Sequence, residues 1–353
     1  MALTAEELQN INNSSLENYI EKGKVFKQNV ANKPMLKAFD ENRGSFSGGN
    51  FYVSVGVKSG QGGGSLAGFT ADDQVSYYNP ASNKRAKYPW KEHHIGISWT
   101  YTEGKVDGID VTESETSTSA MSGREKHALA NIIDEKNDDM GEDYAKSLDL
   151  LVHGDGTSDA KALAGIRSLL LEDPTTGTTG GISRAANSWW RNLALTDANS
   201  NTDVTGSVND GGALLQAIQR TLRLLSVYAQ GGTNWQFFCG TDFYDQMEKE
   251  LRANGNYTQD GFMRESAVDG GMAALKFKGK PIIYDPTLDA ISKQKFLYII
   301  DMKRIKLLYM DGQRMKKHTP SRPYDRYVMF NGITTTAVMA AQQLNTSAII
   351  ELD

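Results

Sequence analysis

The residue types that most often carry catalysis or bind metals are few in this chain, and their spacing argues against such chemistry. The single cysteine, Cys239, follows the apolar run 235–238 and has no histidine near it in the sequence. A buried, inert thiol is therefore expected rather than a nucleophile. His93 and His94 are adjacent, so in a strand they face opposite ways and cannot jointly hold one metal ion. No G-x-S-x-G, H-E-x-x-H or kinase signature occurs, and we predict no enzyme activity, no cofactor and no metal site.

Two glycine- and aspartate-rich motifs also resemble functional loops only superficially. The run 60–64 lacks the Lys-Ser/Thr ending of a phosphate loop and no helix pattern follows it, so a loop tip is predicted. The segment 155–159 lacks most calcium ligands, including the closing glutamate, and is interpreted as a turn. A row of acids is interpreted as a solvated or salt-bridged helix face: Glu135, Asp138, Asp139, Glu142 and Asp143.

The segment 180–192 is the most informative stretch, because it places Trp189 and Trp190 side by side between Arg184 and Arg191, after a glycine pair. Adjacent aromatic residues of a strand cannot both point into one core, so at least one ring is expected to pack on a neighbouring element or another chain. Trp and Arg are favoured anchors of such contacts. The predicted packing residues are Gly180, Gly181, Arg184, Trp189, Trp190, Arg191 and Trp90.

Composition limits the class of protein. The chain has 353 residues, 39% of them hydrophobic, and 34 glycines. This length favours two compact lobes with extended arms that find partners elsewhere. One cysteine excludes an intrachain disulfide. The net charge of −5 gives no broad basic signal, so any DNA contact should be weak and non-specific. The stretches 303–306 and 314–318 gather positive charge, and contact with DNA, an acidic neighbour or another subunit remains open.

No part of the sequence pattern indicates a membrane protein. Residues 1–9 are polar and carry Glu6 and Glu7, where a signal peptide would need lysines and an apolar run. No window approaches eighteen apolar residues. The protein is expected to function in the cytosol or in a particle assembled there.

Hydrophobic periodicity predicts an arm, a hairpin and a long helix in the first half of the chain. An amphipathic helix is predicted over 4–20 and a strand over 51–57. The polar, glycine-containing region that follows leads to an alternating strand over 95–101, and the two strands predict a long, projecting β-hairpin. The longest helical pattern runs over 122–153 without a proline and is stopped by His153-Gly154.

After a Ser-, Asn-, Thr- and Gly-rich candidate linker at 196–212, helices and strands alternate, which predicts an α+β or α/β lobe. Helices are predicted over 213–229 and 241–253, and strands over 235–238, 281–284, 296–301 and 306–310. The C-terminal segment 326–352 is β-prone.

Taken in order, these parts resemble the major capsid proteins of tailed bacteriophages, which have the Hong Kong ninety-seven (HK) type capsid fold. The resemblance covers most of the chain and is most specific in the middle third. It rests on the arm, the hairpin, the long helix and three sequence segments: Lys87-Tyr88-Pro89-Trp90-Lys91-Glu92-His93-His94, His153-Gly154-Asp155-Gly156-Thr157, and Gly180 to Arg184 with Asn187 to Asn192.

The resemblance implies an α+β fold with an N-terminal arm, an extended E-loop, a P-domain with a long spine helix, and an A-domain. By order along the chain, it implies an arm and first strand at 1–57, an E-loop hairpin at 58–103, a P-domain at 104–211 including the spine helix 122–153, an A-domain at 212–320, and a C-terminal β segment at 321–353 that returns to the P-domain.

The implied function is structural: hexamers and pentamers of the chain would form an icosahedral shell around the genome, assembled in the host cytoplasm. The arm begins within a few residues of Met1, so a separate scaffolding protein is expected, together with a portal protein and a decoration protein. An encapsulin compartment, which has the same fold, and a soluble α/β enzyme remain as alternatives.

Overall fold

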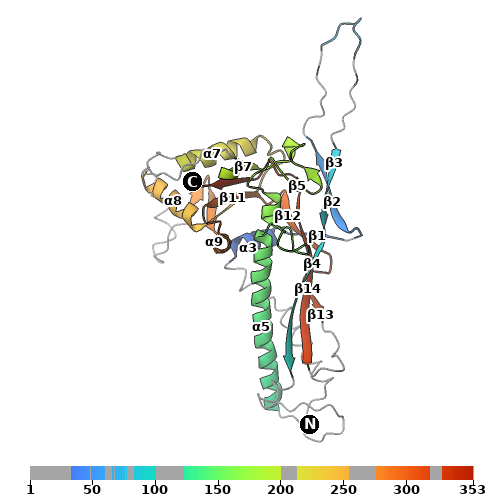
Figure 1. The fold of residues 1–353 in the computed structure, drawn as a ribbon, viewed down its shortest axis with the longest axis vertical. Helices are drawn as coiled ribbons and strands as arrows, with labels where there is room; N and C mark the ends of the chain where they lie inside the picture. The colour runs from blue at the N-terminus through green and yellow to red at the C-terminus, as the bar shows by residue number, and fades with distance from the viewer. Residues whose placement is uncertain are drawn as a thin grey trace.

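A computed structural model of the chain describes residues 33–47, 49–59, 66, 68–75, 77, 83–100, 123–199, 213–253, 275–318 and 328–352. The described part is an elongated α+β molecule with a stem, a side lobe and a projecting hairpin (Figure 1). The predicted arm helix at 4–20 and most of the predicted linker lie outside the described residues. No helix of the described part is long and apolar enough to cross a membrane.

The stem consists of one long helix beside a sheet. Helix α5 (Gly123–His153) has 31 residues, which corresponds to a rod of about 45 Å, and its bounds agree with the predicted 122–153. The Tyr144 hydroxyl lies 2.8 Å from the Thr335 hydroxyl and joins the helix to the central strand of the sheet. That sheet has the order β1-β12-β14-β13, with β4 paired to β14: β1 (Gly44–Phe46), β4 (Lys91–Thr100), β12 (Ile305–Met310), β13 (Lys316–His318) and β14 (Val328–Ala341).

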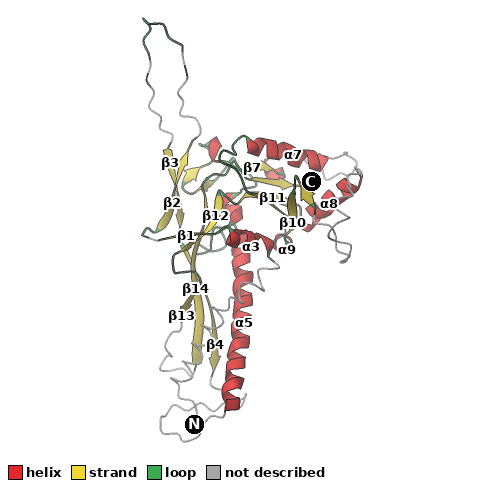
Figure 2. Ribbon diagram, turned by 180° about the vertical axis from the view of Figure 1, so that it is seen from behind, coloured by secondary structure: helices red, strands yellow, loops and turns green. Residues whose placement is uncertain are grey.

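The side lobe is built on a six-stranded mixed sheet with the order β7-β15-β11-β8-β10-β9. Its strands are β7 (Leu193–Leu195), β8 (Trp235–Cys239), β9 (Lys276–Phe277), β10 (Lys280–Tyr284), β11 (Phe296–Asp301) and β15 (Ala348–Glu351). Its helices are α7 (Ala213–Ser226), α8 (Thr241–Ala253) and α9 (Pro286–Ala290). Viewed from behind, the short helix α3 (Pro34–Glu41) lies where α5 reaches this lobe (Figure 2).

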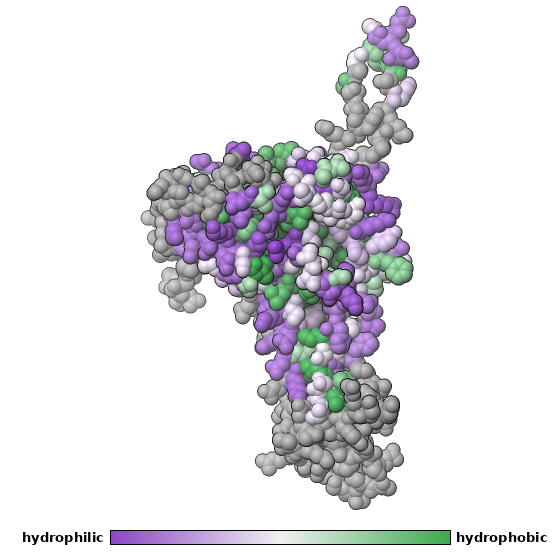
Figure 3. Space-filling model, viewed as in Figure 1, coloured by the Kyte–Doolittle hydropathy of each residue, from purple (hydrophilic) through white to green (hydrophobic). Residues whose placement is uncertain are grey.

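Strand β11 separates two hydrophobic cores. All six of its residues are buried. Tyr298 and Ile300 belong to the core shared with α5, whereas Leu297 and Ile299 belong to the core beneath α7 and α8. Because side chains alternate along a strand, one apolar run supplies both cores. On the face seen in Figure 3, the described residues of the lobe and stem are mostly hydrophilic.

The hairpin differs from the prediction in its second strand. Strand β2 (Tyr52–Lys58) pairs antiparallel with β3 (Asn83–Pro89), and the sequence of β3 is mostly polar. Residues 95–100 of the alternating strand predicted at 95–101 are part of β4 and pair with β14 instead. The reason is that β3 is exposed except at Ala86 and Tyr88, so its periodic signal is weak, while β4 finds a partner more than 200 residues away in the sequence (Val328 pairs with Thr100).

Strand pairing divides the C-terminal third of the chain between the two sheets. Strands β12 and β13 pair with β14 in the stem sheet. Strand β15 pairs with β11 and β7 in the side lobe. Short strands cannot be assigned to one sheet or the other from periodicity alone.

The position of β11 between the two cores predicts that truncation on either face destabilises the whole subunit. Ile299→Ala and Ile300→Ala should each lower the free energy of unfolding by ~2–5 kcal/mol, because both side chains are fully buried. Val227→Ala, at a side chain that is 69% exposed, should change it by less than ~0.5 kcal/mol. Urea unfolding of the soluble subunit measures all three, and an Ile300→Ala variant as stable as Val227→Ala would contradict the shared-wall arrangement.

Candidate functional site: a clamp at the base of the hairpin

A tight glycine turn holds the body of the molecule against the hairpin. Gly180 and Gly181 join β5 (Thr178–Thr179) to β6 (Ile182–Ser183) with φ angles of 60° and 78°, a region that favours glycine. A Cβ atom on Gly180 would lie 2.9 Å from the Ala86 Cβ and 3.1 Å from the Tyr88 ring. The Lys87 amide donates to the Gly180 carbonyl at 2.9 Å. We call residues 178–192 the hairpin clamp, because this turn lies directly against β3.

Arg184 forms the centre of the hairpin clamp. Its side chain is fully buried, and its guanidinium donates to the Thr179 hydroxyl at 2.9 Å, to the Asn192 side-chain carbonyl at 2.7 Å and to the Leu169 carbonyl. Asn192 in turn bonds both the amide and the carbonyl of Leu171. One planar cation therefore joins the glycine turn to the short helix α6 (Ile166–Leu169), which follows α5, and to the start of β7.

The electrostatics of Arg184 are unusual for a buried cation. Its hydrogen-bond acceptors are neutral oxygens, and no carboxylate of the described residues forms an ion pair with it. Burial, reinforced by the nearby Arg191 charge, lowers the pKa of Arg184 to about 10. The group still carries its charge at neutral pH, so it depends on all three acceptors to replace its hydration.

Trp189 and Trp190 lie in a short 3-10 helix, η1 (Ser188–Trp190), rather than in a strand. Their ring centroids are 5.9 Å apart. Trp190 is buried and donates from its indole nitrogen to the Thr179 carbonyl at 3.1 Å. Trp189 is half-buried and packs against the same core. The expectation that adjacent rings must diverge applies to strands, and the helical turn is what lets both rings reach one core.

The outer edge of the hairpin clamp contacts β3 directly. The Lys84 ammonium donates to the Asn187 side chain at 2.6 Å and lies 5.9 Å from the centre of the Trp189 ring, within the range of a cation–π contact. Further along β3, the buried Tyr88 hydroxyl donates to the Ala341 carbonyl of β14 at 3.1 Å. The base of the hairpin is thus fixed to two separate parts of the body.

The remaining predicted packing residues have separate roles. Arg191 donates to the carbonyls of Arg184 and Ala185 at 2.8 and 3.0 Å and so braces the backbone of the hairpin clamp. Trp90 lies at the other end of β3, where its indole nitrogen donates to the Asn50 carbonyl at 3.2 Å and its ring packs 6.0 Å from Phe46.

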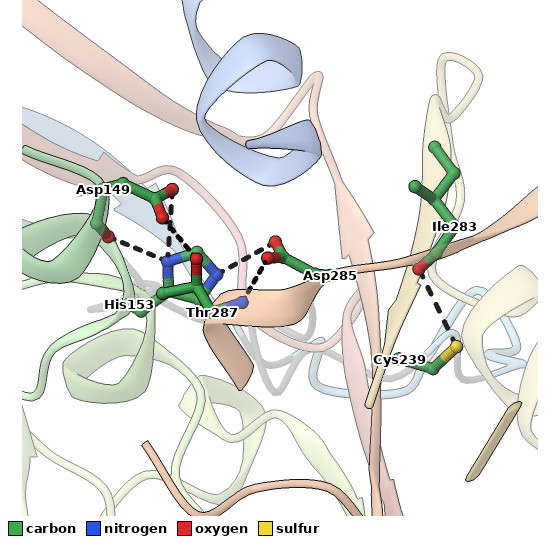
Figure 4. Close-up of polar contacts among 6 residues, drawn as sticks. All are labelled: Asp149, His153, Cys239, Ile283, Asp285 and Thr287. Carbon is green, nitrogen blue, oxygen red and sulfur yellow. Dashed lines mark hydrogen bonds and ion pairs between the residues drawn. The ribbon is translucent and has the colours of Figure 1, made fainter. Parts of the chain in front are cut away.

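A second buried polar cluster joins the end of α5 to the side lobe, as the close-up of its contacts shows (Figure 4). One ring nitrogen of His153, Nδ1, lies 2.8 Å from the Asp149 backbone carbonyl, and the other, Nε2, lies 3.1 Å from an Asp285 oxygen. The other Asp285 oxygen caps α9 by accepting from the Thr287 amide at 3.0 Å. The Thr287 hydroxyl donates to Asp149 and closes the ring of contacts.

Sequence reasoning treated His153 as part of a helix stop and of one segment that carries the family resemblance, and it missed this cluster. The available signals were the i, i+4 spacing of Asp149 and His153, which puts both on one helix face, and the Asp285-Pro286 pair, a typical start of a helix. Neither signal reveals that the two elements meet.

Burial and neighbouring charges together shift the pKa values of His153 and Asp149 in this cluster. Burial opposes protonation of His153, but the hydrogen bond and charge of Asp285, together with Asp149, outweigh it and raise the pKa of the imidazole. Burial raises the pKa of Asp149, which the His153 charge and the Thr287 hydroxyl only partly offset. All of these side chains are withdrawn from solvent, so the arrangement is a structural connection and not an open catalytic site.

The structure places the other chemically suggestive residues as follows. Cys239 is buried, its sulfur lies 3.7 Å from the Ile283 carbonyl, and burial raises the pKa of its thiol (Figure 4). His93 is half-buried and His94 exposed along β4. Asp155 accepts from Thr157 in a turn, as interpreted.

In the part of the chain that the structure describes, no group of three or more metal-ligating side chains occurs. The acids whose side chains are described lie on the exposed face of α5: Asp138, Asp139, Glu142 and Asp143.

Removing the Arg184 guanidinium should destabilise the subunit strongly. Arg184→Met keeps much of the apolar volume but removes one donor from each of three buried acceptors, so the free energy of unfolding should fall by ~2–4 kcal/mol. Arg85→Met removes the same group from an exposed position on β3 and should cost less than ~0.5 kcal/mol. Thermal and urea unfolding of the two variants would contradict the role of Arg184 if their stabilities fell by the same amount.

The raised pKa of His153 predicts a pH dependence of stability. A group whose pKa is higher in the folded than in the unfolded state stabilises fully below its unfolded pKa, near ~6.5 for histidine, and this stabilisation is lost as pH rises through the folded value. The raised pKa of Asp149 acts in the same direction but begins from a lower pH. The unfolding free energy should therefore fall as the solution is made alkaline from about pH 6.5.

A His153→Gln variant should show a flatter dependence over that window, whereas His318→Gln, at an exposed position, should follow the wild type. Urea midpoints measured across this pH range decide between them. A wild-type curve that rises over the window would refute the assignment.

Comparison with known proteins supports the fold through structure alone. No protein-family model and no curated protein sequence matches the chain. A chain of the cyanophage A-1(L) capsid asymmetric unit superposes with a TM-score of 0.64 at 13% identity, over 90% of this chain and 92% of the other. A chain of the bacteriophage PhiM1 mature capsid gives 0.51 at 10% identity, over 89% and 86%. A chain of the cyanophage P-SCSP1u capsid gives 0.50 at 11% identity, over 89% and 88%.

Each of these matches covers at least 89% of this chain and at least 86% of the other chain. The α+β class and the capsid-type architecture expected from the sequence segments are therefore confirmed. The chain has the fold of phage capsid proteins.

Proposed function

We propose that this chain is the major capsid protein of a tailed bacteriophage and that it assembles as hexamers and pentamers into the icosahedral shell around the genome. The proposal places the protein in the virion capsid, after assembly in the host cytoplasm. The observation that carries it is the combination of a phage capsid fold with a hairpin whose tip projects away from both cores.

The hairpin tip is the clearest sign of assembly. Its turn is fixed by Asp73, which accepts from the amide and hydroxyl of Thr70 at 2.8 and 2.6 Å. Four apolar or aromatic side chains there are exposed: Leu66, Phe69, Val75 and Tyr77. The tip lies at the far end of the molecule, away from both cores (Figure 1). A cluster of this kind on a projecting element favours burial against another copy.

The hairpin clamp fits the same role. A projecting hairpin can dock on a neighbour with a defined geometry only if its base is rigid, because free movement at the base would have to be lost on binding. Gly180, Arg184 and Lys84 fix that base through backbone, buried and surface contacts. We therefore assign the clamp a positioning role in assembly, through the hairpin that it holds.

The subdomain assignment belongs to this proposal. The hairpin with its tip corresponds to the E-loop, α5 to the spine helix, the stem sheet with α5 to the P-domain, and the six-stranded side lobe to the A-domain. Pairing of strands supports grouping β12 and β13 with the P-domain and β15 with the A-domain. The order of the chain alone would have divided them differently.

Further partners follow from the shell function. A separate scaffolding protein, a portal protein and a decoration protein are the expected protein partners, and contact with packaged DNA is expected to be weak. An encapsulin-like compartment has the same fold and is the alternative outcome of the experiment below. No catalytic role is proposed.

The role of the hairpin tip can be separated from subunit folding. Phe69→Ser removes an aromatic side chain that is 69% exposed, so the thermal midpoint of the free subunit should stay unchanged while shell formation falls. Phe69→Leu keeps an apolar side chain and should assemble nearly as the wild type. Sedimentation and negative-stain electron microscopy measure the fraction of protein in closed particles.

Equal assembly of the serine and leucine variants would contradict the role of the tip. A wild-type chain that stays a compact monomer in every condition, including with lysate from infected cells, would contradict the proposed function. Closed particles that enclose a cellular protein cargo and no nucleic acid would support the encapsulin alternative instead.

A further inference from the structure

A cavity of about 450 Å³ opens where three distant parts of the chain meet. One wall comes from the end of α3 and the residues after it, Asn42 and Arg43. A second comes from the turn between α7 and β8, at 232–234. The third comes from the β11–β12 connection and β12 itself, with Met302, Lys303 and Lys306.

All of the charged residues that line this cavity are positive. Three of its eight lining residues are cationic, namely Arg43, Lys303 and Lys306, and no acid is among the eight. The acid that pairs with Arg43 is Asp40, at 3.0 Å. Asp40 also binds Arg314, at 2.9 Å, so one carboxylate serves two guanidinium groups. Asp301, which accepts from the Asn234 and Lys303 amides, is a second acid beside the lining. The lining residues themselves carry only positive charge.

Arg43 is held by the Asp40 carboxylate, whereas the side chains of Lys303 and of the neighbouring Arg304 contact neutral carbonyl groups. The Lys303 ammonium donates to the Gly231 carbonyl, and the neighbouring Arg304 donates to the Gln230 carbonyl at 2.7 Å. The turn that supplies these carbonyls is itself fixed, because the Asn234 amide donates to Asp301 at 3.0 Å and the Met302 amide to the Asn234 carbonyl at 3.0 Å. Carbonyl contacts orient a cation without cancelling its charge, which leaves that charge available to an anion.

A phosphate group suits this cationic lining. A guanidinium binds phosphate oxygens in a bidentate manner, and lysine ammonium groups act as point charges that suit a doubly or singly charged oxyanion. The hydroxyl of Thr233 and the side-chain amide of Asn234 add neutral donor groups to the same lining. The cavity is open to the surface, so the phosphate can belong to a longer chain.

We propose that this cavity is an anion site that binds a phosphate group, either in a nucleic-acid backbone or as free phosphate. Arg43, Lys303 and Lys306 are the residues that bind it. The proposal that the phosphate belongs to a nucleic-acid backbone rests on the proposed shell function, since a capsid protein faces packaged DNA. The anion site itself does not rest on that function. The overall charge of −5 does not oppose such a site, because local positive potential decides where a phosphate binds.

Charge reversal tests the site. The double variant Lys303→Glu, Lys306→Glu is compared with Lys276→Glu, Lys316→Glu, which changes the net charge equally at two exposed lysines outside the cavity. Soluble subunit is titrated with inorganic phosphate by calorimetry and with a short fluorescent DNA duplex by anisotropy, at several salt concentrations. The cavity variant should bind at least about tenfold more weakly, with a shallower salt dependence, while the control should stay close to the wild type.

The two probes distinguish the sources. Binding of both, lost together in the cavity variant, supports a site for backbone phosphates; binding of phosphate alone supports a site for the free ion. Circular dichroism of each variant first establishes that it is folded, and Lys303→Gln with Lys306→Gln serves if the reversal unfolds the chain. Equal losses in the cavity and control variants, or a wild type that binds neither probe, would overturn the proposal. Particle formation is scored separately by electron microscopy, so a failed anion site remains distinct from a failed shell function.

Discussion

The buried guanidinium of Arg184 is the interaction on which the shape of this molecule depends most. The hairpin β2–β3 cannot stabilise itself, because two strands with so few buried side chains give too little apolar contact in water. Its position is set by the Gly180 turn, and that turn is held in place by Arg184 through Thr179, Asn192 and Leu169. A cation without a carboxylate partner is sensitive to the loss of any one acceptor, which makes the loop geometry around it specific.

The rest of the fold is organised around β11, whose buried side chains belong to both hydrophobic cores. The side lobe and the stem each have their own sheet, and they would be separate domains if each also had a core of its own. Instead, alternate residues of β8, β11 and β15 face the two cores, so the six-stranded sheet is a wall common to both. The His153 cluster adds a polar connection at the same boundary, between the last turn of α5 and the cap of α9. Rigid-body movement of the lobe against the stem would have to break both connections.

Exposed apolar side chains and the cationic cavity occupy distinct but not wholly separate places on the described part of the chain. Four exposed apolar or aromatic side chains lie at the hairpin tip, and others lie elsewhere, including Val227 and Tyr228 just before the α7–β8 turn. That turn also lines the cavity that contains Arg43, Lys303 and Lys306. The hairpin tip is therefore the exposed apolar group that lies far from the cavity.

The sequence by itself indicated the long helix and several elements of the side lobe, and it singled out the segment 180–192 by its residue types. The helix at 122–153 can be predicted because its apolar residues recur at helical spacing without a proline, and the glycine pair and adjacent tryptophans mark the clamp through residue types alone. Only the tertiary structure decided which strands pair. Residues 83–89 carry almost no periodic signal, and β4 pairs with a strand more than 200 residues away.

The tertiary structure likewise decided that Arg184 is buried, that His153 meets Asp285, and that Arg43, Lys303 and Lys306 line one cavity. Spacing along the chain constrains neighbours within one element, because the helix and strand periods fix which side chains share a face. These contacts instead join elements far apart in the sequence, so they depend on how the separate elements pack.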